Sequence, residues 1–177
     1  MLITKQKFTS QKFAGFSLIE LMVSVAILAI LASIALPSFK AMIRQSQTLN
    51  AAESIVNGLQ KARGEAVARN TNVDFILGTN SSWVVSVGAT QIEARDSKEG
   101  STDTTVTAVR SDLTTAASTV TYNNFGRVAN GVAALARVTL STIGDGKPLG
   151  LRVNIGVGGD TKICDPNLAT GSSLRAC

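Results

Sequence analysis

The hydrophobic and polar positions of the chain fall into three blocks with different periods. In the first block, residues 16–36 are apolar apart from three serines and a single charged residue, Glu20. At a helical rise of ~1.5 Å per residue, a segment of this length spans the hydrocarbon core of a bilayer, which is about 30 Å thick. The pattern therefore predicts a membrane-spanning helix.

The second block, residues 38–70, repeats apolar residues at three- and four-residue spacing, which predicts an amphipathic helix. It follows directly on the first, so residues 16 to about 70 are expected to form one long helix that bends or loosens at Pro37. The basic residues Lys61, Arg63 and Arg69 enclose Glu65, which favours a solvated face over a DNA-binding helix. The apolar repeat consists of Phe39, Met42, Ile43, Leu49, Ala52, Ile55, Val56, Leu59, Ala62, Ala66 and Val67.

From residue 72 the apolar period changes to two, which is typical of strands. We interpret 94–105, rich in polar residues, as a surface loop and 144–148 as a turn. Strands are expected at 73–77, 83–87, 105–110, 119–123, 127–128, 136–140, 151–155 and 162–164, the first two forming a hairpin. The apolar face of this antiparallel sheet needs a cover and helix 38–70 supplies one, so the predicted fold class is α+β.

Glu20 is the unusual residue of the apolar block. A carboxylate within a membrane helix costs a few kcal/mol on insertion scales. Its place in the first helical turn recovers only about 0.3–1 kcal/mol through the helix dipole. Glu20 therefore calls for a partner.

The residues before the apolar block carry Lys5, Lys7 and Lys12 and no acid, and they end in Ala14 and Gly15. In a secretory signal the small residues of the cleavage site follow the apolar segment, whereas here they precede it. A signal peptide cut at 32–35 and a plain signal anchor are the alternatives, and neither accounts for Glu20.

The basic segment ending in K-F-A-G, followed by F-S-L-I-E, resembles the class III leader of type IV prepilins and type II secretion pseudopilins. The resemblance implies that a prepilin peptidase cuts between Gly15 and Phe16 and N-methylates Phe16. It also implies that Glu20 neutralises the terminal amine of a neighbouring subunit during assembly. Pro37 matches the helix-kinking proline of many pilins.

The amino-acid composition indicates neither an enzyme nor a nucleic-acid-binding protein. The chain has no histidine, which removes the usual general base and the commonest metal ligand. No nucleophile and base pattern stands out, so we expect no enzyme, no cofactor, no metal and no small-molecule substrate. Without the three lysines of the leader, the chain has fourteen basic and twelve acidic residues. This small excess of positive charge does not indicate a nucleic-acid partner.

Cys164 and Cys177 are the only cysteines, and twelve residues separate them. They could close a loop in an oxidising periplasm; two free thiols are the alternative. The lysines of the leader place the N-terminal flank in the cytoplasm, although Lys40 and Arg44 on the other flank weaken the asymmetry. We therefore expect a single-pass protein of the bacterial inner membrane whose globular part is periplasmic.

The C-terminal half narrows the resemblance. N-N-F-G-R-V at 123–128 and G-G-D-T-K-I-C-D-P at 158–166, with a closing cysteine, resemble the GspH/FimT class of minor pilins. That class implies a type IV pilin fold with a disulfide-closed tail. The implied domains are a cleaved leader at 1–15, a membrane and assembly helix at 16–37, and a globular domain at 38–177 with its helix at 38–70 and its sheet at 72–177.

The class also implies a function. Such proteins are minor pilins of the tip and initiation complex of a type IV pilus, and they support assembly, twitching, adhesion and natural transformation. Their partners would be the prepilin peptidase, the major pilin, other minor pilins and the inner-membrane assembly platform. The alternative is a GspH-type minor pseudopilin of a type II secretion system.

A second alternative is a DNA-binding competence pilin. In related proteins a G-R-x-R motif binds DNA, and the matching positions here are Gly159, Asp160, Thr161 and Lys162. An acid in place of the first arginine removes a phosphate contact and adds repulsion. Lys162, Arg175 and Arg152 therefore form a weak DNA contact at best, and direct binding to nucleic acid is not expected to be the main function.

Overall fold

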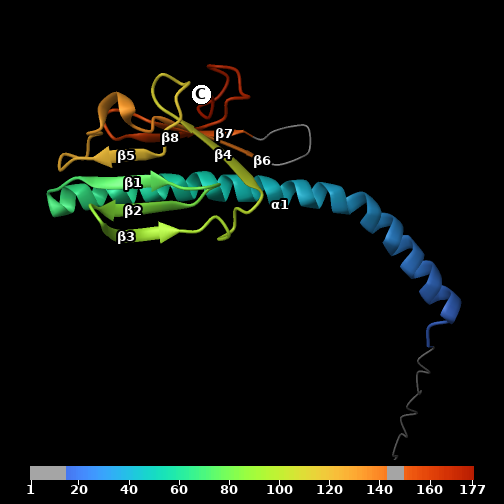
Figure 1. The fold of residues 1–177 in the computed structure, drawn as a ribbon. Helices are drawn as coiled ribbons and strands as arrows, with labels where there is room; N and C mark the ends of the chain where they lie inside the picture. The colour runs from blue at the N-terminus through green and yellow to red at the C-terminus, as the bar shows by residue number, and fades with distance from the viewer. Residues whose placement is uncertain (1–14, 143–149) are drawn as a thin grey trace, which may run out of the picture. The chain divides into compact units, whose positions relative to one another are not determined.

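The computed structural model describes residues 15–142 and 150–177, and one long helix precedes all of its strands (Figure 1). Helix α1 spans Leu18–Arg69, close to the expected 16–70. A short 3-10 helix, η1, spans Gly131–Ala133. The strands are β1 (Val73–Leu77), β2 (Trp83–Val87), β3 (Thr90–Arg95), β4 (Thr104–Val109), β5 (Thr119–Tyr122), β6 (Arg137–Thr142), β7 (Leu151–Ile155) and β8 (Thr161–Cys164).

The chain divides into two compact units, Met1–Phe39 and Lys40–Cys177, and α1 contributes to both. Pro37 lies inside α1, so it does not end the helix; the kink expected there stays a prediction. In the first unit, α1 is long and apolar enough to cross a membrane. The second unit contains every strand and the core.

The helix of the second unit is buried along one face, and that face begins later than the apolar repeat predicts. Phe39, Met42 and Ile43 were expected to pack on the sheet and are instead 42–66% exposed; Val67 is also exposed. The prediction was wrong there because none of the strands in the described residues covers those positions. The buried face consists of Thr48, Ala51, Ala52, Ser54, Ile55, Gly58, Leu59, Ala62 and Ala66.

The strands form two four-stranded antiparallel sheets rather than the single sheet that was expected. Their orders are β3-β2-β1-β5 and β4-β6-β7-β8. The predicted hairpin of β1 and β2 is confirmed, with Phe75 opposite Val85. The alternating pattern places strands along the chain but carries no information about which strands pair, so it could not predict the division.

Strand β3 was not predicted, and its last two residues lie in the segment 94–105 that was expected to be a loop. Every side chain of β3 is exposed or half-buried, as in an edge strand, so no buried apolar face marks it in the sequence. The strand expected at 127–128 is a single bridge between Tyr122 and Val128. The turn expected at 144–148 lies outside the described residues.

The helix approaches the first sheet closely at Gly58. A Cβ atom at this position would lie 2.8 Å from Phe75 Cε2 and 2.9 Å from Trp83 Cδ2. The indole N–H of Trp83 donates to Ser54 Oγ at 2.8 Å, and the residue is only 4% exposed, so it belongs to the core as expected. Glycine is therefore required for this helix to lie against the aromatic pair.

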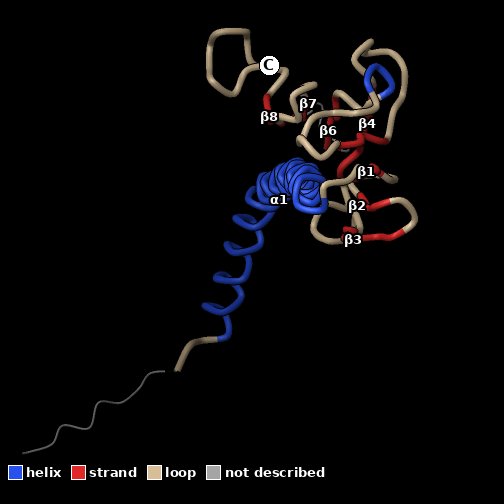
Figure 2. Tube along the Cα trace, turned by 90° about the vertical axis from the view of Figure 1, so that its left-hand side faces the viewer, coloured by secondary structure: helices blue, strands red, loops and turns tan. Residues whose placement is uncertain are grey.

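One hydrophobic core joins α1 to both sheets. Ile55 and Leu59 of the helix belong to the same buried cluster as Val120 of the first sheet and Val138 and Val153 of the second. Viewed along the helix in Figure 2, the strands follow one another around it from β3 to β8. The sheets expose their outer faces, and those faces and the exposed half of α1 are the surfaces available for function.

Candidate functional site

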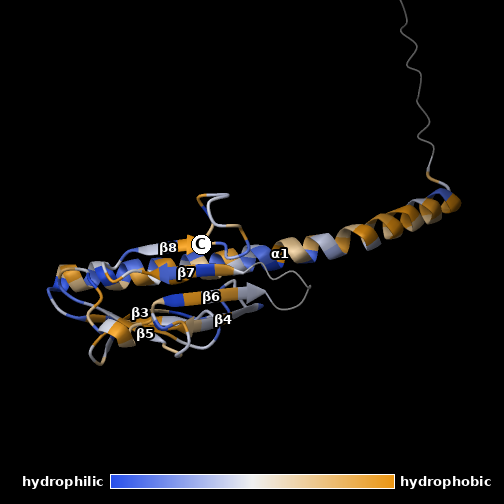
Figure 3. Cartoon of the chain, turned by 90° about the horizontal axis from the view of Figure 1, so that it is seen from above, coloured by the Kyte–Doolittle hydropathy of each residue, from blue (hydrophilic) through white to orange (hydrophobic). Residues whose placement is uncertain are grey.

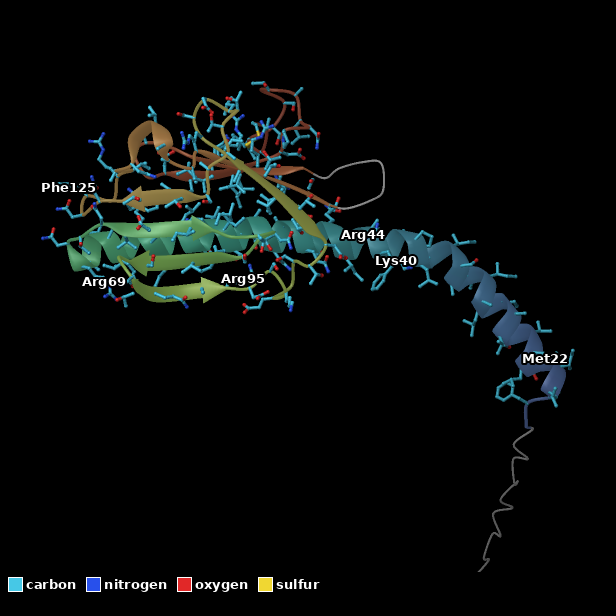
Figure 4. The ribbon with its side chains drawn as sticks, viewed as in Figure 1. Met22, Lys40, Arg44, Arg69, Arg95 and Phe125 are labelled. Carbon is cyan, nitrogen blue, oxygen red and sulfur yellow. A yellow bond between two sulfur atoms is a disulfide. The ribbon has the colours of Figure 1, made fainter. Side chains whose placement is uncertain are left out.

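The N-terminal part of α1 is an uncovered apolar surface. Every residue from 15 to 43 is exposed, including Leu21, Ile27 and Ile34 at 53–72%. Figure 3 colours this part of the helix almost entirely as hydrophobic, and Figure 4 labels Met22 among its projecting side chains. A surface of this size needs an apolar environment, which a bilayer or neighbouring helices supply.

Glu20 lies in the first turn of α1 and interrupts this apolar surface. Its backbone N–H donates to Ser17 Oγ at 3.3 Å, and its carbonyl accepts from Ser24 Oγ at 2.7 Å. Within residues 15–142 and 150–177, the structure gives its carboxylate no hydrogen-bond or ion-pair partner. A partner for this charge must come from outside the described chain, and the predicted pairing with a terminal amine stays a prediction.

Gly15 and Phe16 lie just before the helix, and both are exposed. Phe16 is 86% exposed and is followed by Ser17, which caps the helix. A peptide bond outside the helix is accessible to a peptidase, which agrees with the predicted cut. The rest of the predicted leader lies outside the described residues, and cleavage and methylation stay predictions.

The C-terminal tail is closed by a disulfide between Cys164 and Cys177, which confirms the predicted pairing. Cys164 ends β8 and is buried, and its Cα lies 5.0 Å from that of Cys177. The tail also runs back beside β8: the N–H of Asp165 donates to the carbonyl of Arg175 at 2.6 Å. The disulfide and this backbone contact fix both ends of the tail loop.

Replacing both cysteines with serine is expected to lower the free energy of unfolding by about 3 kcal/mol, since the unfolded chain gains the freedom of an open loop. Urea unfolding of the full-length protein in detergent measures this difference. Non-reduced protein purified from its native membrane should contain no alkylatable thiol. Two alkylatable thiols, or an unchanged unfolding midpoint, would contradict the prediction.

The three basic residues that the sequence suggested as weak DNA contacts do not all lie together. Arg152 and Lys162 lie on neighbouring strands, β7 and β8, and their side chains are half-buried and exposed respectively. Arg175 is exposed in the tail. DNA contact by these residues stays a prediction.

Arg63 was expected to be part of a solvated basic face, but the structure assigns it a different role. Its Nε donates to the carbonyl of Gly126 at 2.9 Å and ties the helix to the loop after β5. Lys61 and Arg69 do lie on the outside, where both pair with Glu65, at 3.1 and 2.6 Å. The hydrogen bond from Arg69 is the main reason that the pKa of Glu65 is lowered.

The carbonyl of Gly126 is reached from a second side by the β7–β8 turn. A Cβ atom on Gly159 would collide with that carbonyl oxygen, and Gly159 has φ +83°. The helix, the loop after β5 and this turn therefore meet at one point, held by Arg63. Gly126 and Gly159 belong to the two motifs at 123–128 and 158–166, but nothing in these motifs indicates the contact with Arg63.

Comparison with known proteins agrees with these features. A family model described as a prokaryotic N-terminal methylation motif matches residues 10–36. A second model, described as type II transport protein GspH, matches residues 51–159 and thus more than half of the chain. The chain belongs to the GspH/FimT family of type IV pilin-like proteins.

Two curated relatives of this pilin-like chain are Pseudomonas aeruginosa proteins, each described as a fimbrial protein. They are 33% and 32% identical to it over 107 residues, which cover 55% of this chain and 69% of theirs. A crystal structure of the type IV minor pilin FimU of the same species superposes with a TM-score of 0.53 at 19% identity. It covers 74% of this chain and 98% of FimU, and it confirms the expected pilin fold. The family and the fold are those of structural pilins, not enzymes.

Proposed function

We propose that this protein is a minor pilin, a membrane-anchored structural subunit that joins the tip and initiation complex of a type IV pilus. The observation that carries the proposal is the methylation motif at 10–36, which continues into an exposed apolar helix whose carboxylate, Glu20, has no partner among the described residues. A helix of this kind can move from lipid into a bundle of like helices without exposing apolar surface to water. The domain boundaries at 15–16 and 37–38 follow from this proposal.

The assembly step depends on two charges. Cleavage after Gly15 by the prepilin peptidase creates a terminal amine at Phe16, which the same enzyme methylates. Glu20 lies four residues beyond that terminus, inside an apolar helix where a lone charge is penalised. Pairing with the amine of the major pilin or of another minor pilin satisfies both charges in a medium of low dielectric constant. The inner-membrane assembly platform would bring the two helices together, with the globular units on the periplasmic side.

A type II secretion pseudopilus is the second candidate, and the description of the matching family model as a type II transport protein favours it. The two relatives described as fimbrial proteins favour the pilus. A deletion strain separates the candidates: loss of surface pili with normal protein export supports the pilus. Normal piliation with lost export would support the secretion system.

Mass spectrometry of the N-terminus of the protein from its native membrane is the most direct test of processing. We expect a chain that begins at N-methylated Phe16, because Gly15 and the basic segment before it resemble a prepilin leader. A terminus near residue 35 would instead indicate an ordinary signal peptide and would contradict the assembly proposal.

A further inference from the structure

The outer face of the second sheet gathers basic side chains from neighbouring strands. Arg137 of β6 lies opposite Asn154 of β7, which lies opposite Lys162 of β8. Residues directly opposite one another in antiparallel strands point to the same face of the sheet. The alternate positions, Val138 and Val153, are fully buried in the core, so Arg137 and Lys162 point away from it. The alternation is visible as changing colour along β6 and β7 in Figure 3.

Arg152 occupies the centre of this face. Arg152 pairs with Thr139 of β6 and with Cys164 of β8. These partners lie two residues along their strands from Arg137 and Lys162, so Arg152 is the diagonal neighbour of both cations. Diagonal neighbours in a sheet are about 7–8 Å apart, within reach of long side chains. The three cations Arg137, Arg152 and Lys162 form what we call the basic face.

No carboxylate among the described residues forms an ion pair with the basic face. The two acids nearest to β8 in the sequence are engaged elsewhere. The carboxylate of Asp160 lies against Gly156 in the β7–β8 turn. Asp165 Oδ1 accepts from the backbone N–H of Asn167 at 2.8 Å. The described chain therefore does not neutralise the basic face.

The hydrogen bonds of the basic face also leave donors unused. Arg137 Nε donates to Asn154 Oδ1 at 3.2 Å, which orients the guanidinium, and no described residue accepts from its terminal nitrogens. Arg152 Nε is shielded from solvent and has no acceptor within the described part of the chain. Burial, and secondly the charge of Arg152, lower the pKa of Arg137. Leaving a shielded donor without an acceptor is unfavourable, and a bound anion that the Nε–H can reach removes this cost.

We propose that the basic face binds a dianionic phosphate group, with Arg152 at its centre and Arg137 and Lys162 on either side. Guanidinium groups match tetrahedral oxyanions because each presents two parallel N–H donors to two oxygens. Three positive charges suit a dianion better than a carboxylate, which carries one negative charge. The group is either free inorganic phosphate or the phosphomonoester of a larger molecule. This site is on the globular unit, does not involve Glu20 and is independent of the proposed assembly function.

The test uses full-length protein in detergent micelles and records the NMR signals of the arginine Nε–Hε groups. Inorganic phosphate, at a pH where it is a dianion, is expected to shift the Arg152 signal saturably. Sodium chloride of equal ionic strength is expected to leave it unchanged. Binding to Arg137→Gln is followed through the Arg152 signal, and binding to Arg152→Gln through the Arg137 signal. Each substitution should weaken binding about tenfold or more, since each removes a charged guanidinium group with its paired N–H donors.

Arg127→Gln is the matched control, because Arg127 is an exposed arginine in the loop after β5 and lies outside the basic face. It should keep the wild-type affinity. An intact disulfide and an unchanged unfolding midpoint show that a variant is folded. Equal losses in Arg127→Gln and Arg152→Gln, or no saturable shift in the wild type, would overturn the proposal.

Two further probes identify the source of the phosphate. Equal affinity for glycerol phosphate and inorganic phosphate supports free phosphate, and tighter binding of glycerol phosphate supports a phosphomonoester of a larger molecule. Duplex DNA presents phosphodiesters, each with one negative charge, and binds basic surfaces in a strongly salt-dependent manner. Binding of DNA without binding of either small phosphate would overturn the proposal, because it would indicate a diffuse polyanion surface rather than a phosphate site.

Discussion

Replacing Glu20 with alanine is expected to leave the protein in the membrane and to reduce its incorporation into filaments by about tenfold or more. Insertion should improve slightly, since the variant removes a charge from an apolar helix. Assembly should fail because the amine of a neighbouring subunit would be buried without its partner, which costs about 3–5 kcal/mol. The measurement is the amount of the protein in sheared filaments relative to the membrane fraction.

Ser24→Ala is the matched control for Glu20→Ala. Ser24 lies one turn further along the same helix, and within the described residues its hydroxyl donates only to the carbonyl of Glu20, at 2.7 Å. The Ser24→Ala variant removes a polar group from the same helix surface without changing the charge of that surface, so incorporation should remain close to the wild-type level. Normal incorporation of Glu20→Ala, or an equal loss in both variants, would refute the charge-pairing mechanism.

Gly159→Ala is expected to lower the free energy of unfolding by roughly 2–5 kcal/mol. Part of this cost, about 1–2 kcal/mol, comes from placing a Cβ atom on a residue with φ +83°. The remainder, roughly 1–3 kcal/mol, comes from the collision with the carbonyl of Gly126, which Arg63 holds in place. For a domain of ordinary stability this is a large fraction of the total.

Gly171→Ala separates these two contributions. Gly171 has nearly the same backbone angle, φ +85°, but nothing lies within 4 Å of a Cβ atom placed on it. It should therefore show the conformational cost alone. Urea unfolding of both variants gives the difference, and equal destabilisation would mean that the contact among the helix, the loop and the turn has little energetic importance.

The sequence was most informative where a single period extends over many residues. The apolar block and the repeat after it predicted α1 within two residues at its start and one at its end, because helix formation over such a length depends on local pattern. The hairpin of β1 and β2 followed from the alternation of the two strands and the turn-rich residues 78–82 between them. The tail disulfide was also expected, with two free thiols as the alternative, because Cys164 and Cys177 are the only two cysteines of the chain.

What the sequence did not indicate depends on contacts between distant segments. The division into two sheets is decided by β4, which pairs with β6 across a separation of about 30 residues. The sequence around Arg63 predicts a solvated helix face, because nothing in it shows that the loop containing Gly126 lies beside this residue. Arg137 attracted no attention because its closeness to Arg152 exists only in the register of β6 and β7.

The tail loop offers a practical position for a probe. Residues 167–175 are all exposed, and Leu174 is 96% exposed, so the loop contributes little to the core. Its two ends are held by the disulfide and by the contact between Asp165 and Arg175, and an insertion between them need not alter β8. Exposed loop tips of this kind tolerate added residues. A short epitope tag or a fluorophore placed there would report where the subunit lies in a filament while leaving α1 and the basic face unmodified.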